Sequence, residues 1–130
     1  ELEKTRPAGS AGIYASGHLI SKPTAREADE YYHYLVYENG DWEAAEHTVK
    51  IRTRGGSTSG AKLAEMKEVI ISGTGTHCVK GSYDAVAEHF KALSKCGIDG
   101  MAIGLVNYID DFPALRDEVL PRMQRLGLRV

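Results

Sequence analysis

Hydrophobic and polar side chains alternate along residues 12–21, which read Gly-Ile-Tyr-Ala-Ser-Gly-His-Leu-Ile-Ser. This period of two and the poor helix propensity predict a β-strand, which Lys22-Pro23 ends. One face of the strand carries small and apolar residues, which are Ile13, Ala15, Gly17 and Leu19. The other face carries the polar groups and consists of Tyr14, Ser16, His18 and Ile20. We therefore expect the polar face to look into a pocket or a barrel interior.

Helical patterns follow this strand. Thr24-x-x-Glu27 is a capping box that opens a helix ending at Asn39-Gly40. Asp41 is placed to cap a second, shorter helix. Residues 52–60, Arg-Thr-Arg-Gly-Gly-Ser-Thr-Ser-Gly, indicate a flexible polar loop, and a third helical pattern comes after it.

The second half repeats a strand–helix order. A short strand is predicted around residues 77–80, followed by a helix from Gly81-Ser82 to Gly97. The apolar run Met101–Val106 is typical of a parallel strand covered on both faces. Asp110 or Asp111 is expected to cap a last helix, which Pro121 should kink. This alternation predicts an α/β fold with a parallel sheet.

Composition narrows the class of protein. The chain has 130 residues, 42% of them hydrophobic and 26% charged, with a formal net charge of -2. These values are typical of one globular segment and argue against a disordered chain or a nucleic-acid binder with a basic surface. No apolar run is long enough to span a membrane. With two cysteines and no signal-peptide pattern, we expect a cytoplasmic setting.

The histidines and cysteines do not have the spacing of a metal site. His77-Cys78 and the pair His89 and Cys96 lack the regular intervals at which zinc ligands recur. We therefore expect no bound metal.

The C-terminal part carries motifs of a known family. Residues 75–84 read Gly-Thr-His-Cys-Val-Lys-Gly-Ser-Tyr-Asp, and later come Val106-Asn-Tyr-Ile-Asp-Asp and Asp117-Glu-Val-Leu-Pro. These stretches resemble the C-terminal end of bacterial-luciferase-like, flavin-dependent monooxygenases, closest to the dimethyl sulfone and alkanesulfonate branch. Tyr83-Asp84 replaces the branch's usual Pro-Glu, and both pairs put an acid in the first helical turn.

The resemblance implies a fold and a division of the chain. The family fold is a TIM (β/α)8 barrel of roughly 250 residues. Residues 1–130 would form one incomplete segment that supplies about strands six to eight with their helices. The flavin phosphate site is expected upstream of Glu1. Loop 52–60 corresponds to the family's variable lid, with Arg52, Arg54, Gly55 and Gly56 as its lid residues.

The resemblance also implies site residues. The family's sixth strand often carries an Arg-x-His pair, whose histidine falls on His18 and whose arginine falls on Ser16. His18 is the candidate catalytic residue, for hydrogen bonding or proton transfer. The loss of arginine argues against guanidinium binding of a sulfonate. Tyr14 and Ser16 share its strand face, while Asn107 and Tyr108 follow the last strand, where barrel active sites lie.

The function that the resemblance implies is oxygenation of a small organic substrate, with organosulfur compounds as a candidate class, by O2 and reduced FMN from a separate flavin reductase. The full-length protein would be this enzyme. Two alternatives remain open: a non-catalytic, self-associating half-barrel without a complete flavin site, and a deazaflavin-dependent reductase. The tyrosine-rich helix is a candidate interface of a homo-oligomer: Tyr31, Tyr32, Tyr34 and Tyr37.

Overall fold

Three parallel strands form the centre of the protein, whose computed structural model describes residues 12–54 and 60–128. They are β1 (Tyr14–Lys22), β2 (His77–Ser82) and β3 (Gly100–Leu105). β1 lies in the middle and pairs in parallel with both neighbours. Its Gly17 is opposite His77 of β2 and Ile103 of β3. The predicted α/β fold with parallel strands is confirmed.

The strand order is β2-β1-β3. In a closed barrel successive strands are neighbours, so three consecutive barrel strands would lie in the order β1-β2-β3. Here β3 pairs with β1, and the described strands form an open sheet. The structure therefore shares the parallel α/β character of a barrel segment, while its strand order differs from that of successive barrel strands.

Helices between β1 and β2 begin where the sequence predicts. These are α2 (Ala25–His33), which continues as the π-helical turn η1 (Tyr34–Glu38), then α3 (Trp42–Arg52) and α4 (Gly60–Gly73). The Thr24 hydroxyl accepts from the Glu27 amide at 3.1 Å and donates to the Glu27 carboxylate at 2.7 Å. The Asp41 carboxylate accepts from the Ala44 amide at 2.8 Å. Both predicted caps are confirmed.

After β2, α5 (Tyr83–Lys95) precedes β3, and α6 (Tyr108–Ala114) follows it. The predicted cap of α6 by Asp110 or Asp111 is wrong. Asn107 is the cap, and its side-chain oxygen accepts from the Ile109 amide at 3.1 Å. Asp111 lies inside the first turn, where its carboxylate accepts from the Asn107 amide and from Lys22 at 3.0 Å each. This partly buried ion pair ties the end of β1 to α6.

The distortion predicted at Pro121 takes the form of a wide turn. The π-helical turn η2 (Leu115–Val119) lies between α6 and α7 (Leu120–Arg125), and Pro121 stands in the first turn of α7. Proline has no backbone N–H to donate to the preceding turn, so the regular α-helical hydrogen-bond ladder is interrupted there. A single π-helical turn within an α-helix is one way to absorb such an interruption.

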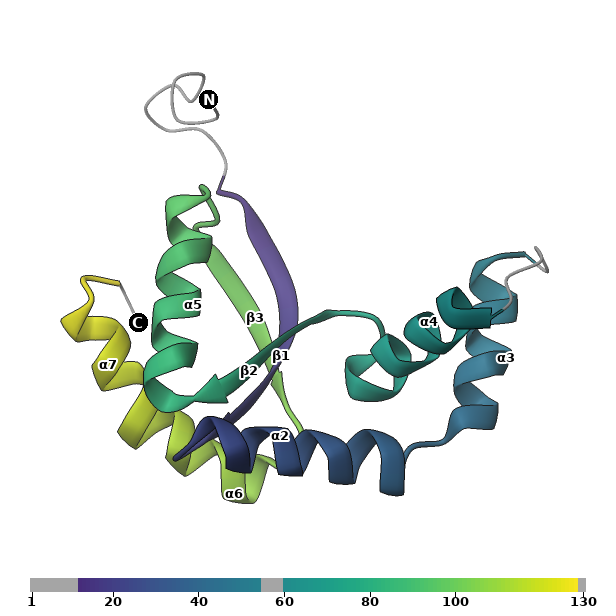
Figure 1. Ribbon diagram of the computed structural model, residues 1–130. Coiled ribbons are helices and arrows are strands. Elements are labelled where there is room, and N and C mark those ends of the chain that lie inside the picture. Colours follow the sequence, from purple (N-terminus) through teal and green to yellow (C-terminus); the bar gives the residue numbers. More distant parts are fainter. Residues whose placement is uncertain (1–11, 55–59, 129–130) are drawn as a thin grey trace.

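The hydrophobic core lies on one face of the sheet, which α5, η2 and α7 cover (Figure 1). Its buried members come from β1, β2, α5 and η2: Leu19, Val79, Val86, Phe90 and Val119. The inward position of Leu19 confirms the predicted apolar face of β1. The interpretation of Met101–Val106 as a strand covered on both faces is wrong, because Ala102 is exposed and Val106 is 42% exposed. β3 has one neighbouring strand among the described residues.

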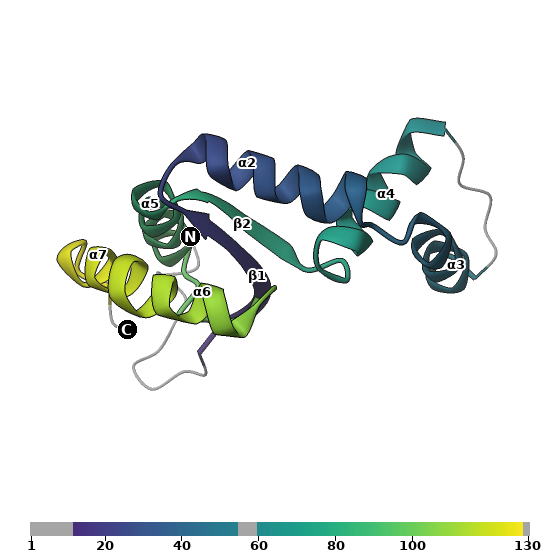
Figure 2. The same cartoon turned by 90° about the horizontal axis from the view of Figure 1, so that it is seen from below.

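Helices α3 and α4 pack against each other at the far end of α2, away from α5 and α7 (Figures 1 and 2). Seen from below, α2 and the α6–α7 segment run on opposite sides of β1 (Figure 2). Within the described ranges, no helix combines the length and apolar character that crossing a membrane requires.

Candidate functional site

A cavity of about 540 Å³ opens on the side of the sheet opposite the core. Its walls come from β1, from β3 and from the connection between α4 and β2. The lining residues are Ser16, Gly17, His18, Ser72, Gly73, Thr74, Thr76, Ala102, Ile103, Gly104, Leu105 and Val106. This size is within the range of small-molecule binding sites.

His18 is the ionisable residue of this cavity, and only 7% of it is exposed. Its Nδ1 lies 3.1 Å from the Thr76 hydroxyl. Its Nε2 is fully buried and has no hydrogen-bond partner among the described residues. Because buried polar atoms are nearly always paired, this nitrogen needs a hydrogen-bond partner that the described residues do not supply.

The turn after α4 holds His18 in place. α4 ends at Gly73, and Thr74 and Gly75 both adopt positive φ, at 57° and 85°. Gly73 packs directly against the His18 imidazole, and a β-carbon there would overlap the ring. Arg52, at the end of α3, donates from Nη2 to the Thr74 carbonyl at 2.8 Å. The turn is thus anchored from α3 and presses against the histidine.

Two histidines have lowered pKa values, His18 on β1 and His89 on α5. Burial, and then the nearby His77, lower the pKa of His18 below 6.5. The same two causes lower the pKa of His89. His77 and His89 stack with ring centroids 5.1 Å apart, and their Nε2 atoms approach to 2.9 Å. Only one of these two nitrogens can carry the shared proton, so protonation of both rings is unfavourable.

We expect the protein to lose stability as the pH falls from 7.5 to 5.5. The unfolded chain takes up protons on His18 and His89 near pH 6.5, while the folded chain resists them, so acid favours unfolding. Stability from this source is present above about pH 6.5 and declines below it. Urea denaturation at both pH values checks this. A His18→Gln, His89→Gln variant should show a smaller loss, and an equal loss would contradict the assignment.

The structure brings two predicted pocket residues together. Ser16 and His18 both line the cavity, one strand period apart on β1. Tyr14 lies at the start of β1, is 75% exposed and packs near Gly100 rather than in the cavity. Asn107 and Tyr108 follow the C-terminal end of β3. They are outside the cavity lining, although their neighbour Val106 is part of it. Asn107 is engaged as the cap of α6, and Tyr108 is 63% exposed.

The predicted lid is described only at its two ends. Arg52 belongs to α3 and is bound to the turn beside His18, and Arg54 has a positive φ of 52°. Gly55 and Gly56 lie outside the described residues. A role of this loop in closing the site remains a prediction.

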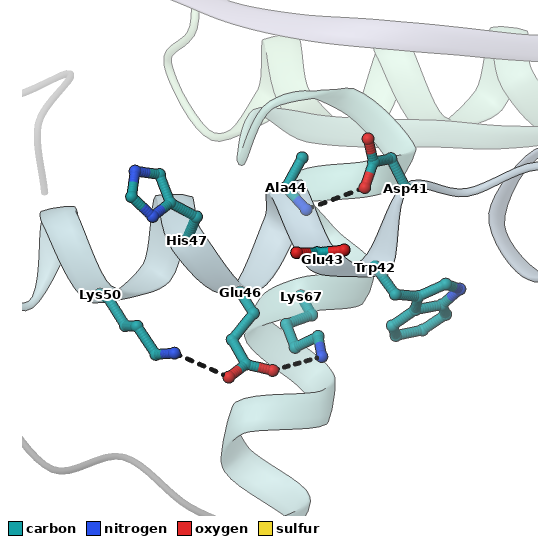
Figure 3. Close-up of a pocket in the computed structure, with 8 residues that line it drawn as sticks. All are labelled: Asp41, Trp42, Glu43, Ala44, Glu46, His47, Lys50 and Lys67. Atoms are coloured by element: carbon teal, nitrogen blue, oxygen red, sulfur yellow. Dashed lines mark hydrogen bonds and ion pairs between the residues drawn. The ribbon is translucent and has the colours of Figure 1, made fainter.

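A second cavity, of about 670 Å³, lies between α3 and α4 (Figure 3). Its charged groups bind one another: Glu46 accepts from Lys50 at 2.9 Å and from Lys67 at 3.0 Å. These two ammonium groups lower the Glu46 pKa. Lys67 also lies 5.7 Å from the centroid of the Trp42 ring. This cavity contains no buried unpaired side-chain atom among the described residues, so the His18 cavity is the better candidate site.

Gly73 and Thr76 were not predicted from the sequence as partners of His18. Thr76 is 58 positions away from His18 in the chain. It reaches the imidazole because β1 and β2 pair with Gly17 opposite His77. The Gly73-x-Gly75 pattern is the available local signal, since it marks the turn that precedes β2.

Comparison with known proteins gives a structural match. No protein-family model and no curated protein sequence matches the chain. A solved structure does match, the crystal structure of riboflavin lyase (RcaE) with modified FMN and the substrate riboflavin. The TM-score is 0.72 at 17% sequence identity, over 99% of this chain and 34% of that one. The chain thus spans about a third of that protein's length, and the likeness shows a shared fold.

Proposed function

We propose that this chain forms part of a flavin-dependent enzyme, with the His18 cavity as part of its flavin and substrate site. In the fuller form of the proposal, the whole protein is a barrel enzyme that uses reduced FMN and O2 to oxygenate a small organic substrate. A separate flavin reductase would supply the reduced FMN. The motifs shared with luciferase-like monooxygenases favour this reaction class, and the fold match to a flavin-related protein supports the cofactor.

The buried, unpaired Nε2 of His18 is the observation that carries the proposal. His18 lines a cavity large enough for a small ligand, on the side of the sheet opposite the core. Ser16 adds a hydroxyl to the same wall. A reduced isoalloxazine ring carries N–H groups, and its donors match an imidazole nitrogen that accepts.

The cavity fits the ring end of FMN better than its phosphate end. The cavity lining that the structure describes contains no lysine or arginine. A dianionic phosphate needs cationic side chains or several backbone N–H groups directed at it. The phosphate would therefore be held by residues outside this cavity. When bound, reduced FMN would supply the electrons for reaction with O2, and His18 and Ser16 would bind and orient the ring or the substrate.

Anaerobic calorimetry of this chain with reduced FMN tests the proposal. We expect saturable binding of about one flavin per chain or per dimer. His18→Ala should weaken it about tenfold, which is the upper end for one lost hydrogen bond. The exposed His47, which lies in the other cavity, gives the matched control His47→Ala. Absence of binding at millimolar FMN, or equal affinity in the two variants, would contradict a flavin site in this chain.

Self-association without a flavin site is the second candidate function. The edge of β3 that faces away from β1 is unpaired among the described strands. Three apolar side chains in the segment that follows β3 are also exposed: Val106, Ile109 and Phe112. Such an edge favours pairing with another chain. A concentration-dependent dimer in analytical ultracentrifugation, together with no flavin binding, would favour this alternative.

A further inference from the structure

We propose that Thr76 is a positioning residue that holds His18 in the Nδ1–H tautomer, so that the buried Nε2 accepts a hydrogen bond from a ligand N–H or O–H group. This inference concerns the chemistry of the same cavity. Its ligand part rests on the proposed function, while the tautomer assignment stands on the hydrogen bonds of the protein alone.

The Thr76 hydroxyl has one proton, and its hydrogen bonds show where that proton is used. Its oxygen lies 2.7 Å from the Gly73 carbonyl, which can only accept. The hydroxyl proton is therefore donated to Gly73. Toward His18, at 3.1 Å, the same oxygen can only accept. The hydrogen between the two side chains must come from the imidazole, which places the proton on Nδ1.

A neutral imidazole carries one N–H, so the other nitrogen then presents a lone pair. His18 is buried and its pKa is lowered, so the ring is neutral at pH 7.5. Nε2 is thus an acceptor with no donor among the described residues. Gly73 packs against the ring, and the missing β-carbon leaves just enough space for this orientation.

The assignment defines what kind of ligand group fits. An N–H or O–H donor matches Nε2. A sulfonate or carboxylate oxygen does not, because its lone pairs would repel the lone pair of Nε2. The nitrogens of a reduced flavin ring and the hydroxyl of an alcohol or hydrate belong to the matching class. Ser16 in place of arginine points the same way, because no cation of the described lining would compensate an oxyanion.

Nitrogen-15 NMR of the histidine side chains at pH 7.5 tests the tautomer directly. We expect the protonated nitrogen of His18 to be Nδ1 in the wild-type chain. Thr76→Ser keeps the hydroxyl and should keep this pattern. Thr76→Val keeps the shape, removes the acceptor and should shift the population toward Nε2–H. Because the wild-type spectrum alone decides the assignment, a Thr76→Val variant that fails to fold leaves the test intact.

Two results would overturn the inference: a wild-type His18 protonated mainly on Nε2, or a folded Thr76→Val variant with an unchanged tautomer. The ligand part is tested by titration with reduced FMN. We expect Thr76→Ser to bind like the wild type and Thr76→Val to bind about fivefold to tenfold more weakly. Equal binding by both variants would overturn the ligand part. An Nδ1–H tautomer in a chain that binds no FMN would instead contradict the proposed function and support the tautomer assignment.

Discussion

Replacing Leu19 with alanine is expected to lower the free energy of unfolding by about 2–5 kcal/mol. Leu19 is 1% exposed and lies at the centre of the core cluster with Val79, Val86 and Phe90. The truncation removes buried methyl groups and leaves a space that the surrounding sheet and helix cannot fully close. Urea denaturation followed by far-ultraviolet circular dichroism measures the change.

The matched control is Ile51→Ala. Ile51 is also a branched aliphatic side chain, but it is 65% exposed, on α3. Its truncation removes little buried surface, so we expect a change within about 0.5 kcal/mol. A loss at Leu19 no larger than the loss at Ile51 would show that the β1–α5 contact is not the core of the folded chain.

Local signals in the sequence predicted the elements of this fold well. The two-residue alternation on β1 correctly placed Leu19 toward the core and His18 on the other face. The Thr24 and Asp41 caps also hold, because a capping residue and the amides it binds lie within a few positions of each other. Interactions of this range depend on neighbouring residues alone.

Long-range pairing could not be obtained in the same way. The order β2-β1-β3 depends on which strand edges meet, and no residue pattern on β3 specifies β1 as its partner. The apolar run of β3 predicts coverage on both faces, but the described chain covers only one of them. The α6 cap was predicted wrongly because Asn107, Asp110 and Asp111 are all residue types that can cap a helix. Asn107 is the cap, and Asp111 instead binds Lys22, which is 89 positions away in the chain.

The candidate site was likewise predicted only in part from the sequence. His18 was found from its strand face and its resemblance to a family histidine. Its partners Thr76 and Gly73 come from a turn on the far side of α4, and only the parallel pairing of β1 with β2 brings that turn to the imidazole. The chemistry that distinguishes this histidine, an oriented tautomer and an unpaired buried nitrogen, is therefore a property of the tertiary structure.

Adding one methyl group at Gly17 is expected to destabilise the sheet by about 1–3 kcal/mol. A β-carbon on Gly17 would overlap the terminal methyl group of Met101 and lie 2.6 Å from the His77 carbonyl oxygen. Met101 has a flexible end that can move, but the carbonyl belongs to the β2 backbone. The Gly17→Ala substitution must therefore push β2 away from β1, and with it the Thr76 turn that binds His18.

Gly104→Ala is the matched control for this effect. Gly104 lies on β3 opposite His18, and a β-carbon there would meet its nearest atoms at 3.8 and 4.0 Å, which is ordinary contact. Both substitutions add the same methyl group to the same sheet, so their difference in urea denaturation isolates the clash with β2. In the nitrogen-15 spectrum, Gly17→Ala should disturb the His18 signals, and Gly104→Ala should leave the tautomer unchanged. Equal stability of the two variants would mean that β1 and β2 do not approach as closely as the structure shows, and the Thr76–His18 contact would lose its basis.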